Sequence, residues 1–432
     1  YENNSHLLLQ MILIIIIIKF RLIILKDVIM KKVGLIFVLM FTSALNAETL
    51  EHVEEEVHIA LETIGQLKAE INELKEIVKM QGEIQESTTS RIAKTAKKFE
   101  KLHLGGYGEL HYNDTETDGG TKSKSMDAHR FVLFFGYDFN EKVRFRSEFE
   151  LEHALVKDTA DGSNGGEVEL EQMYIEMDLS DATSLRAGVI LIPMGILNEH
   201  HEPPTFYGVE RNDVEKYLIP TTWWAGGVEV VHKTKNGFMF EAMLHEGMKG
   251  SATTGYIRGG RQKSASATAN DLAYTARITY TGIPGLKASL FYNHQADFTQ
   301  DSGDNIDKLD IMGASAIYQF GSGFEVRGLH VQAEFDGKDE SGTFFTNGFD
   351  EQQGTFLEVS KRFGNVGFFA NNSVVSGESI SRQYTVVQYG FSWWPQGTDA
   401  VIKANWYDKE YSNPSKDSSD ADGIHLGMGY EF

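Results

Sequence analysis

The fold is decided by a stretch of alternating residues, Val143-Arg-Phe-Arg-Ser-Glu-Phe-Glu-Leu-Glu152, within the segment Lys142–Leu155. Apolar side chains occupy nearly every second position, and charged side chains fill most of the positions between them. Because successive side chains of a β-strand point to opposite faces, this pattern predicts a strand with one apolar and one charged face. A single strand of this kind fits a soluble sandwich as well as a membrane barrel, so the fold must be inferred from all the strands of the chain together.

From residue 102 onward the chain contains sixteen such segments, most of them as long as the roughly 9–11 residues with which a tilted strand crosses a bilayer. The predicted strands are 103–113, 127–139, 142–156, 167–179, 184–191, 226–233, 237–246, 271–281, 285–295, 308–320, 323–335, 355–363, 366–375, 383–394, 400–409 and 423–432.

The connections between these segments alternate in length. Short turns such as Asn140-Glu141 and Gly364-Asn365 alternate with long polar links such as Asp114–Ser125 and Gly247–Asn270. Short turns on one side and long loops on the other are typical of outer-membrane barrels, in which closure leaves no free strand edge. A soluble sandwich gives no reason for this alternation.

The end of the chain agrees with a barrel. The pattern His425-x-Gly427-x-x-Tyr430-x-Phe432 resembles the C-terminal signal read by the outer-membrane assembly machinery. We therefore predict an all-β membrane protein with a 16-stranded antiparallel outer-membrane β-barrel over residues 102–432, in a Gram-negative bacterium. After residue 47 no apolar stretch is long enough for a transmembrane helix.

Residues 1–47 are expected to be an upstream and signal-peptide region. Met30-Lys31-Lys32 opens a basic segment, Val33–Leu45 is apolar, and Ala47 is the small residue before the expected cleavage site. We expect translation to start at Met30. Removal of residues 1–47 leaves 35 basic and 60 acidic side chains, a net charge of −25.

Residues 48–101 are predicted to form a short periplasmic α-helical coiled coil and a linker. Apolar residues recur at gaps of four and three, and Glu and Lys fill the flanks, which is the pattern of a heptad seam. The seam weakens at Gln81-Gly82. The seam residues are Val53, Val57, Ala60, Ile64, Leu67, Ile71, Leu74 and Val78.

Composition excludes several classes of function. The chain has no cysteine, so it has no disulfide framework, Cys-ligated zinc or thiol nucleophile. Its acidic charge argues against a nucleic-acid partner, because that affinity depends on Lys and Arg neutralising phosphates. No spacing indicates a catalytic triad or a phosphate-binding glycine loop, so we expect no enzyme activity and no cofactor. The adjacent pair His200-His201 cannot readily aim at one ion, so no metal site is expected there.

The longest link, from Pro193 to Trp223, carries four of the seven prolines and several aromatic residues. Stiff prolines and aromatic anchors predict an ordered segment. Its place after the fifth strand is that of the link that folds into the lumen in trimeric porins. We interpret it as a constriction loop, with an ordered external lid as the alternative.

Three segments resemble the phosphate-selective porin (O/P type) superfamily: Leu104-Gly-Gly-Tyr-Gly-Glu-Leu-His-Tyr112, His129-Arg-Phe-Val-Leu-Phe-Phe135 and Asn198-Glu-His-His-Glu-Pro-Pro-Thr-Phe-Tyr-Gly-Val-Glu-Arg211. The resemblance covers most of residues 102–432 and includes the preceding coiled coil of some relatives. It implies a trimeric diffusion channel and leaves the solute open.

Strand parity and the long link give candidate pore residues. We expect basic wall residues opposite an acidic loop to create a transverse field that ranks ions. The alternative is that these charges pair with one another across strands. The proposed constriction residues are Glu199, His200, His201, Glu202, Glu210, Arg211 and Asp213, and the proposed wall residues are Arg130, Arg144, Arg146, Glu148, Glu150 and Arg186.

The leading hypothesis is a porin for passive diffusion of small hydrophilic solutes and ions, embedded in outer-membrane lipid as a homotrimer and narrowed by the loop after strand five. A substrate-specific channel for a siderophore or an organic anion is the second hypothesis. The third is an envelope tether whose coiled coil binds the cell wall while the barrel serves as anchor.

Overall fold

A computed structural model describes residues 31–32, 50–154, 166–251, 255–301, 304, 306–339, 341–377, 383–413 and 419–432. Apart from Lys31 and Lys32, which are helical, the expected signal-peptide region 1–47 lies outside the described residues.

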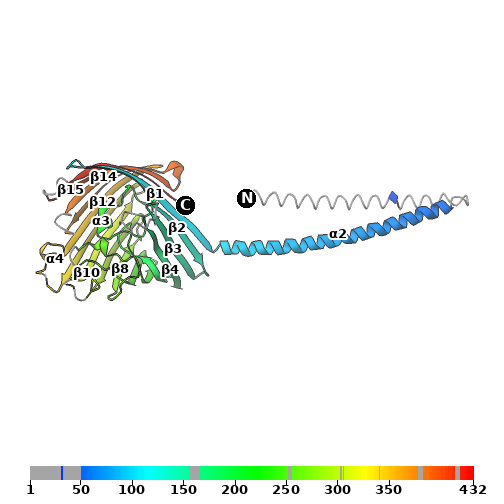
Figure 1. The fold of residues 1–432 in the computed structure, drawn as a ribbon, viewed down its shortest axis with the longest axis horizontal. Coiled ribbons are helices and arrows are strands. Elements are labelled where there is room, and N and C mark those ends of the chain that lie inside the picture. Colours follow the sequence, from blue (N-terminus) through cyan, green and yellow to red (C-terminus); the bar gives the residue numbers. More distant parts are fainter. Residues whose placement is uncertain are drawn as a thin grey trace, which may run out of the picture. The chain divides into compact units, whose positions relative to one another are not determined.

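Sixteen strands of the described residues pair antiparallel, each with its neighbours in sequence, and the last strand pairs with the first to close a barrel (Figure 1). The predicted fold class and strand number are confirmed. The strands are β1 Leu102–Thr117, β2 Lys122–Asp138, β3 Val143–Glu152, β4 Val168–Ser180, β5 Thr183–Leu191, β6 Trp224–Lys233, β7 Phe238–His245, β8 Ala273–Tyr280, β9 Leu286–Gln295, β10 Ile306–Gln319, β11 Phe324–Gly337, β12 Glu351–Phe363, β13 Val366–Ser376, β14 Tyr384–Trp393, β15 Ala400–Tyr411 and β16 Ala421–Glu431.

The two faces of each strand differ as the alternation predicts. In β3, Phe149 is 43% exposed on the outside, whereas Glu148 and Glu150 are 1% and 0% exposed on the inside. In β16, Ile424, Leu426 and Met428 lie on the outer face. An apolar outer surface and a charged interior are the arrangement that a bilayer and an enclosed aqueous space require.

One predicted link is wrong. Residues 114–125 were expected to form a long loop, but β1 and β2 continue through them and leave only residues 118–121 between the strands. Ion pairs across this extension, Lys122–Glu116 at 3.0 Å and Lys124–Asp114 at 2.7 Å, join the polar strand ends. The polar residues 114–125 therefore belong to the part of the β1–β2 hairpin that extends beyond the apolar band of the barrel, where the two strands still pair.

Two register shifts redirect side chains into the barrel. In β2, Arg130 pairs with Glu109 but Asp127 pairs with His111, so β2 holds one extra residue between them. In β4, Gln172 faces Glu148 while Leu170 faces Phe149, which leaves Glu171 as the extra residue. Because of the second shift, the carboxylates on both sides of it, Glu169 before and Glu176 after, face inward.

The N-terminal unit is one helix, α2 Leu50–Phe99. It continues past Gly82 to Phe99, over residues expected to be a linker, because no proline or strong breaker interrupts them. Several seam residues, including Ile64, Leu74 and Val78, are more than a third exposed. Among the described residues, no helix is long and apolar enough to cross a membrane.

Candidate functional site

The segment between β5 and β6, residues 192–223, packs against the inside of the barrel. It contains a short 3-10 turn, η3 Pro203–Thr205, and a short helix, α3 Asp213–Tyr217. Its apolar side chains Met194, Val214, Leu218 and Ile219 are fully buried. They belong to a hydrophobic cluster with inward-facing residues of β7 and β9–β14, which are Met243, Phe291, Ile306, Leu309, Ile311, Leu329, Val331, Ala333, Phe335, Phe356, Val375, Tyr384 and Val386.

Glycines make room for this segment. A Cβ atom at Gly354 of β12 would lie 2.7 Å from side-chain atoms of Val214 and Leu218, and one at Gly429 of β16 would lie 2.2 Å from Pro203. Any larger side chain at these positions would displace α3 or η3. These inward glycines therefore fix where the segment approaches the wall.

Two buried polar side chains hold the segment's own backbone. The Asn198 amide donates to the carbonyls of Ile192 and Trp223, both at 2.8 Å, and its oxygen accepts from the Trp223 N–H at 2.7 Å. The Glu215 carboxylate accepts the N–H groups of Ile196 and Leu197 at 2.5 and 2.7 Å. Burial raises the pKa of Glu215, although these hydrogen bonds oppose the rise. The bonds tie both ends of the segment together.

Wall residues also bind the segment from several strands. Lys403 donates to the Gly208 carbonyl at 2.8 Å, and Ser392 donates to the Tyr207 carbonyl at 2.9 Å. The oxygen of Asn405 accepts the Val209 N–H at 3.0 Å. These bonds come from β14 and β15. The segment is therefore fixed on the inner wall.

The acidic candidates of the segment are paired with the wall. Glu199 forms an ion pair with Arg277 of β8, and Glu210 lies 3.1 Å from His111 of β1. Burial alone would raise the pKa of Glu199 and of Glu210, but Arg277 and His111 respectively lower it below its usual range. Asp213 lies 3.7 Å from Lys409.

His201 is buried between two wall carboxylates, whereas its neighbour His200 is exposed. Its Nε2 atom lies 3.2 Å from Glu171 and 3.5 Å from Glu148. Burial alone would lower the pKa of His201, but these carboxylates outweigh it and raise the pKa to about 10. The ligand atoms of the three side chains lie within 4.8 Å of one another, and the protonated imidazole supplies the positive charge there. Glu202 is partly buried, which raises its pKa.

The candidate wall arginines pair with wall carboxylates. Arg130 lies 2.7 Å from Glu109 and 3.5 Å from Glu150. The other pairs are Arg144 with Glu176 and Asp178, Arg146 with Asp138, and Arg186 with Glu176 and Glu229. The pairing alternative weighed from the sequence describes these four arginines. The transverse field between a basic wall and an acidic loop stays a prediction.

A cavity of about 170 Å³ lies between the segment and the wall of β1–β4, and around it the loops are mainly basic and the strands mainly acidic. Six basic and four acidic side chains line it, which gives an excess of two positive charges when histidine is counted as neutral. Most of the cations come from loops and most of the carboxylates from strands. The basic residues are Arg130, Arg211, Lys216, Arg258, Arg261 and Lys263, and the acidic residues are Glu109, Glu152, Glu169 and Glu210.

Three of these cations, Arg211, Arg258 and Arg261, have no carboxylate partner within the described part of the chain. Arg258 donates to the carbonyls of Lys216 and Thr221 at 2.9 and 2.5 Å, and Arg261 bonds to the Thr222 carbonyl. Burial, together with the neighbouring Arg261, lowers the pKa of Arg258 to about 10, so it stays charged near neutral pH. Among the described residues, the buried Nη2 atom of Arg211 has no hydrogen-bond partner. Arg258 and Arg261, in the link after β7, were missed by the sequence analysis because no periodicity marks them.

Comparison with known proteins gives a likeness of fold. No family model matches the chain. Over 234 residues, 52% of its length, the chain is 35% identical to a protein of Aquifex aeolicus (strain VF5) described only as uncharacterized, and it spans about half (51%) of that protein.

Among solved structures, an anion-selective porin from Comamonas acidovorans has a TM-score of 0.53 at 13% identity, covering 77% of this chain and 99% of that one. The outer-membrane channel DcaP of Acinetobacter baumannii has a TM-score of 0.51 at 11% identity, covering 77% and 97%. OprB of Pseudomonas putida has a TM-score of 0.50 at 13% identity, covering 79% and 96%. The barrel therefore has the fold of outer-membrane porins.

Proposed function

We propose that the chain is an outer-membrane porin of a Gram-negative bacterium, a water-filled channel for passive diffusion of small hydrophilic solutes and ions. The observation that carries this proposal is a closed sixteen-stranded barrel with a charged interior along β1–β5. A barrel of this size is wide enough for an aqueous channel.

The segment 192–223 is the constriction in this proposal. Its apolar side chains cover the wall of β7 and β9–β14, and that part of the interior is packed with side chains. The charged wall of β1–β4 is left beside the cavity of about 170 Å³. Solutes would therefore pass between the segment and this wall.

The constriction would favour small anions over cations. The excess of two positive charges around the cavity, including three arginines without carboxylate partners in the described part of the chain, attracts anions although the chain as a whole is acidic. This local excess is compatible with the phosphate-selective porin superfamily that the sequence resembles, and membership of that superfamily is part of the proposal.

The homotrimer and the self-association of α2 also belong to the proposal. The seam of α2 exposes Ile64, Leu74 and Val78, which a second copy would bury. Covalent cross-linking of the purified protein, followed by denaturing electrophoresis, measures the subunit number directly.

Conductance of the purified protein in planar bilayers tests the proposed function. We expect ohmic steps that do not saturate with solute. A variant with residues 199–217 replaced by a short Gly-Ser linker should give larger steps, whereas a matched change to the turn 118–121 should not alter them. Saturation by one solute would favour the substrate-specific channel, and an absence of conductance would favour the envelope tether.

A further inference from the structure

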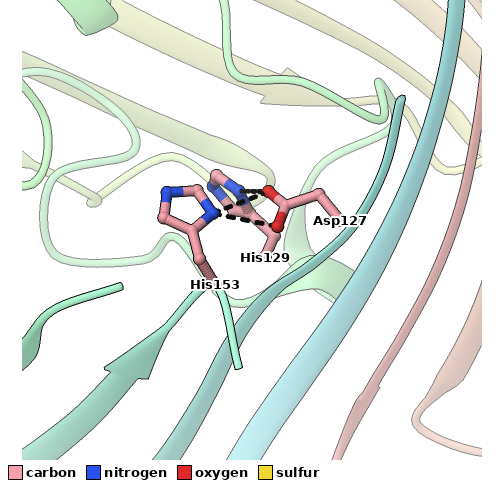
Figure 2. A group of neighbouring side chains, drawn as sticks. All are labelled: Asp127, His129 and His153. Carbon is pink, nitrogen blue, oxygen red and sulfur yellow. Dashed lines mark hydrogen bonds and ion pairs between the residues drawn. The ribbon is translucent and has the colours of Figure 1, made fainter. Parts of the chain in front are cut away.

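Three potential metal ligands meet at one point on the inner wall. Asp127 and His129 belong to β2, and His153 follows directly after the end of β3 (Figure 2). The Nδ1 atom of His129 lies 3.0 Å from Asp127 Oδ2, and the Nδ1 atom of His153 lies 2.9 Å from each Asp127 oxygen. All three side chains point toward one another.

The register shift in β2 creates this meeting point. Without the extra residue, His129 and Arg130 would face opposite sides of the sheet. With it, both line the cavity beside the constriction segment, and His153 lines the same cavity from the turn after β3. Spacing along the sequence gave no sign of this cluster, because His129 lies in β2 and His153 follows the end of β3.

The chemistry of the trio is that of a transition-metal site. One oxygen and two imidazole nitrogens lie within 4.8 Å of one another. Ligands about 2.0–2.2 Å from a tetrahedral zinc ion are themselves about 3.3 Å apart, so small side-chain rotations would bring these atoms to a common ion. Three protein ligands leave a fourth position for water, as in open zinc sites.

Two of the three ligands, His129 and His153, line the cavity, and His129 is also held in place by a neighbouring ring. The side chains of His153, Asp127 and His129 are 45%, 30% and 24% exposed. The ring of His129 stacks on that of His111 at 4.7 Å, and His111 is held by Glu109 and Glu210 at 3.1 Å each. This stacking keeps the His129 ring in place beside Asp127.

We propose that Asp127, His129 and His153 form a binding site for a divalent transition-metal ion of the zinc class on the wall beside the constriction. Nitrogen ligands favour zinc, copper and nickel over calcium and magnesium, which prefer oxygen. The site goes beyond solute diffusion, and the ion would enter it from the lumen.

Binding of Zn²⁺ to the purified full-length protein, measured by equilibrium dialysis, tests the site without reference to channel activity. We expect one Zn²⁺ per chain. Loss of a residue that only supports a metal ligand typically lowers metal affinity about 10- to 100-fold. Loss of a ligand itself should lower the affinity for Zn²⁺ at least about tenfold, so we expect this decrease in Asp127→Asn, His129→Ala and His153→Ala. The matched control is His103→Ala, which removes a histidine 2.7 Å from Asp138 that belongs to no group of three potential ligands among the described residues.

Electron paramagnetic resonance of bound Cu²⁺ gives a second readout. We expect superhyperfine splitting from two ligand nitrogens in the native protein and from one in His153→Ala. This substitution lies beyond the end of β3, outside the paired strands. Equal Zn²⁺ binding in the native protein and all three variants would overturn the proposal, as would Ca²⁺ binding as tight as Zn²⁺ binding. A protein that binds Zn²⁺ but does not conduct would refute the porin function and leave the metal site standing.

Discussion

Neutralising the unpaired arginines of the link after β7 should reduce anion preference. A cavity of about 170 Å³ corresponds to a sphere of radius about 3.4 Å, so an ion at its centre is roughly 6 Å from a lining guanidinium. At that distance one unit charge contributes about 0.7 kcal/mol in the dielectric of water, or about a threefold change in ion occupancy. Loss of two charges changes occupancy about tenfold.

The assay is the reversal potential across a bilayer in a KCl gradient. Arg258→Gln and Arg261→Gln should each lower the anion-to-cation permeability ratio about threefold, and the double variant about tenfold, with smaller effects at high salt. Arg258→Lys keeps the charge and should keep the ratio. Lys235→Gln, at the exposed turn between β6 and β7, is the control for a charge outside the cavity. An unchanged ratio in the double variant would refute the reasoning.

Three further changes address the anchoring of the segment 192–223. Gly354→Leu should displace α3 and raise single-channel conductance, whereas Gly328→Leu, which meets open space, should not; equal steps in both would contradict the packing described. His201 has a folded-state pKa of about 10, above its usual 6.5, so its hold on the wall is complete below about pH 6.5 and is lost as pH rises toward 10. Current noise in the native channel should therefore grow over that range, and a pH-independent noise equal to that of His201→Gln would argue against this anchor. Glu215→Ala leaves two buried N–H groups without an acceptor, which costs about 1–3 kcal/mol each, and should make the segment more sensitive to proteases. Glu215→Gln keeps an acceptor and should leave the segment protected. Equal cleavage rates in the two variants would count against the role of this carboxylate.

The fold could be predicted from the sequence because each strand repeats one physical rule. Alternation of apolar and charged residues, as at Phe149 and Glu150, determines which face meets lipid, and short turns determine which strands are neighbours. The rule failed at residues 114–125, where polar residues continue the hairpin above the apolar band.

The site could be predicted only in part. The position and prolines of the segment 192–223 predicted an ordered loop, but not which charges it would face. Arg258 and Arg261 come from the link after β7 and reach the cavity beside β1–β4 only in the closed barrel. The bulge in β4 places Glu171 beside His201. Ion pairing across neighbouring strands, as between Arg130 and Glu109, depends on register, which periodicity does not determine.

The most direct test of the central claim, that solutes pass between the segment and the wall of β1–β4, uses the absence of native cysteine. A single cysteine at Arg211 or Glu152, on opposite sides of the cavity, should react with a charged membrane-impermeant thiol reagent and reduce the current of an open channel. A cysteine at Phe149, on the outer face of the same strand as Glu152, should leave the current unchanged. Current that is insensitive to the reagent at both cavity positions in a conducting protein would contradict this path.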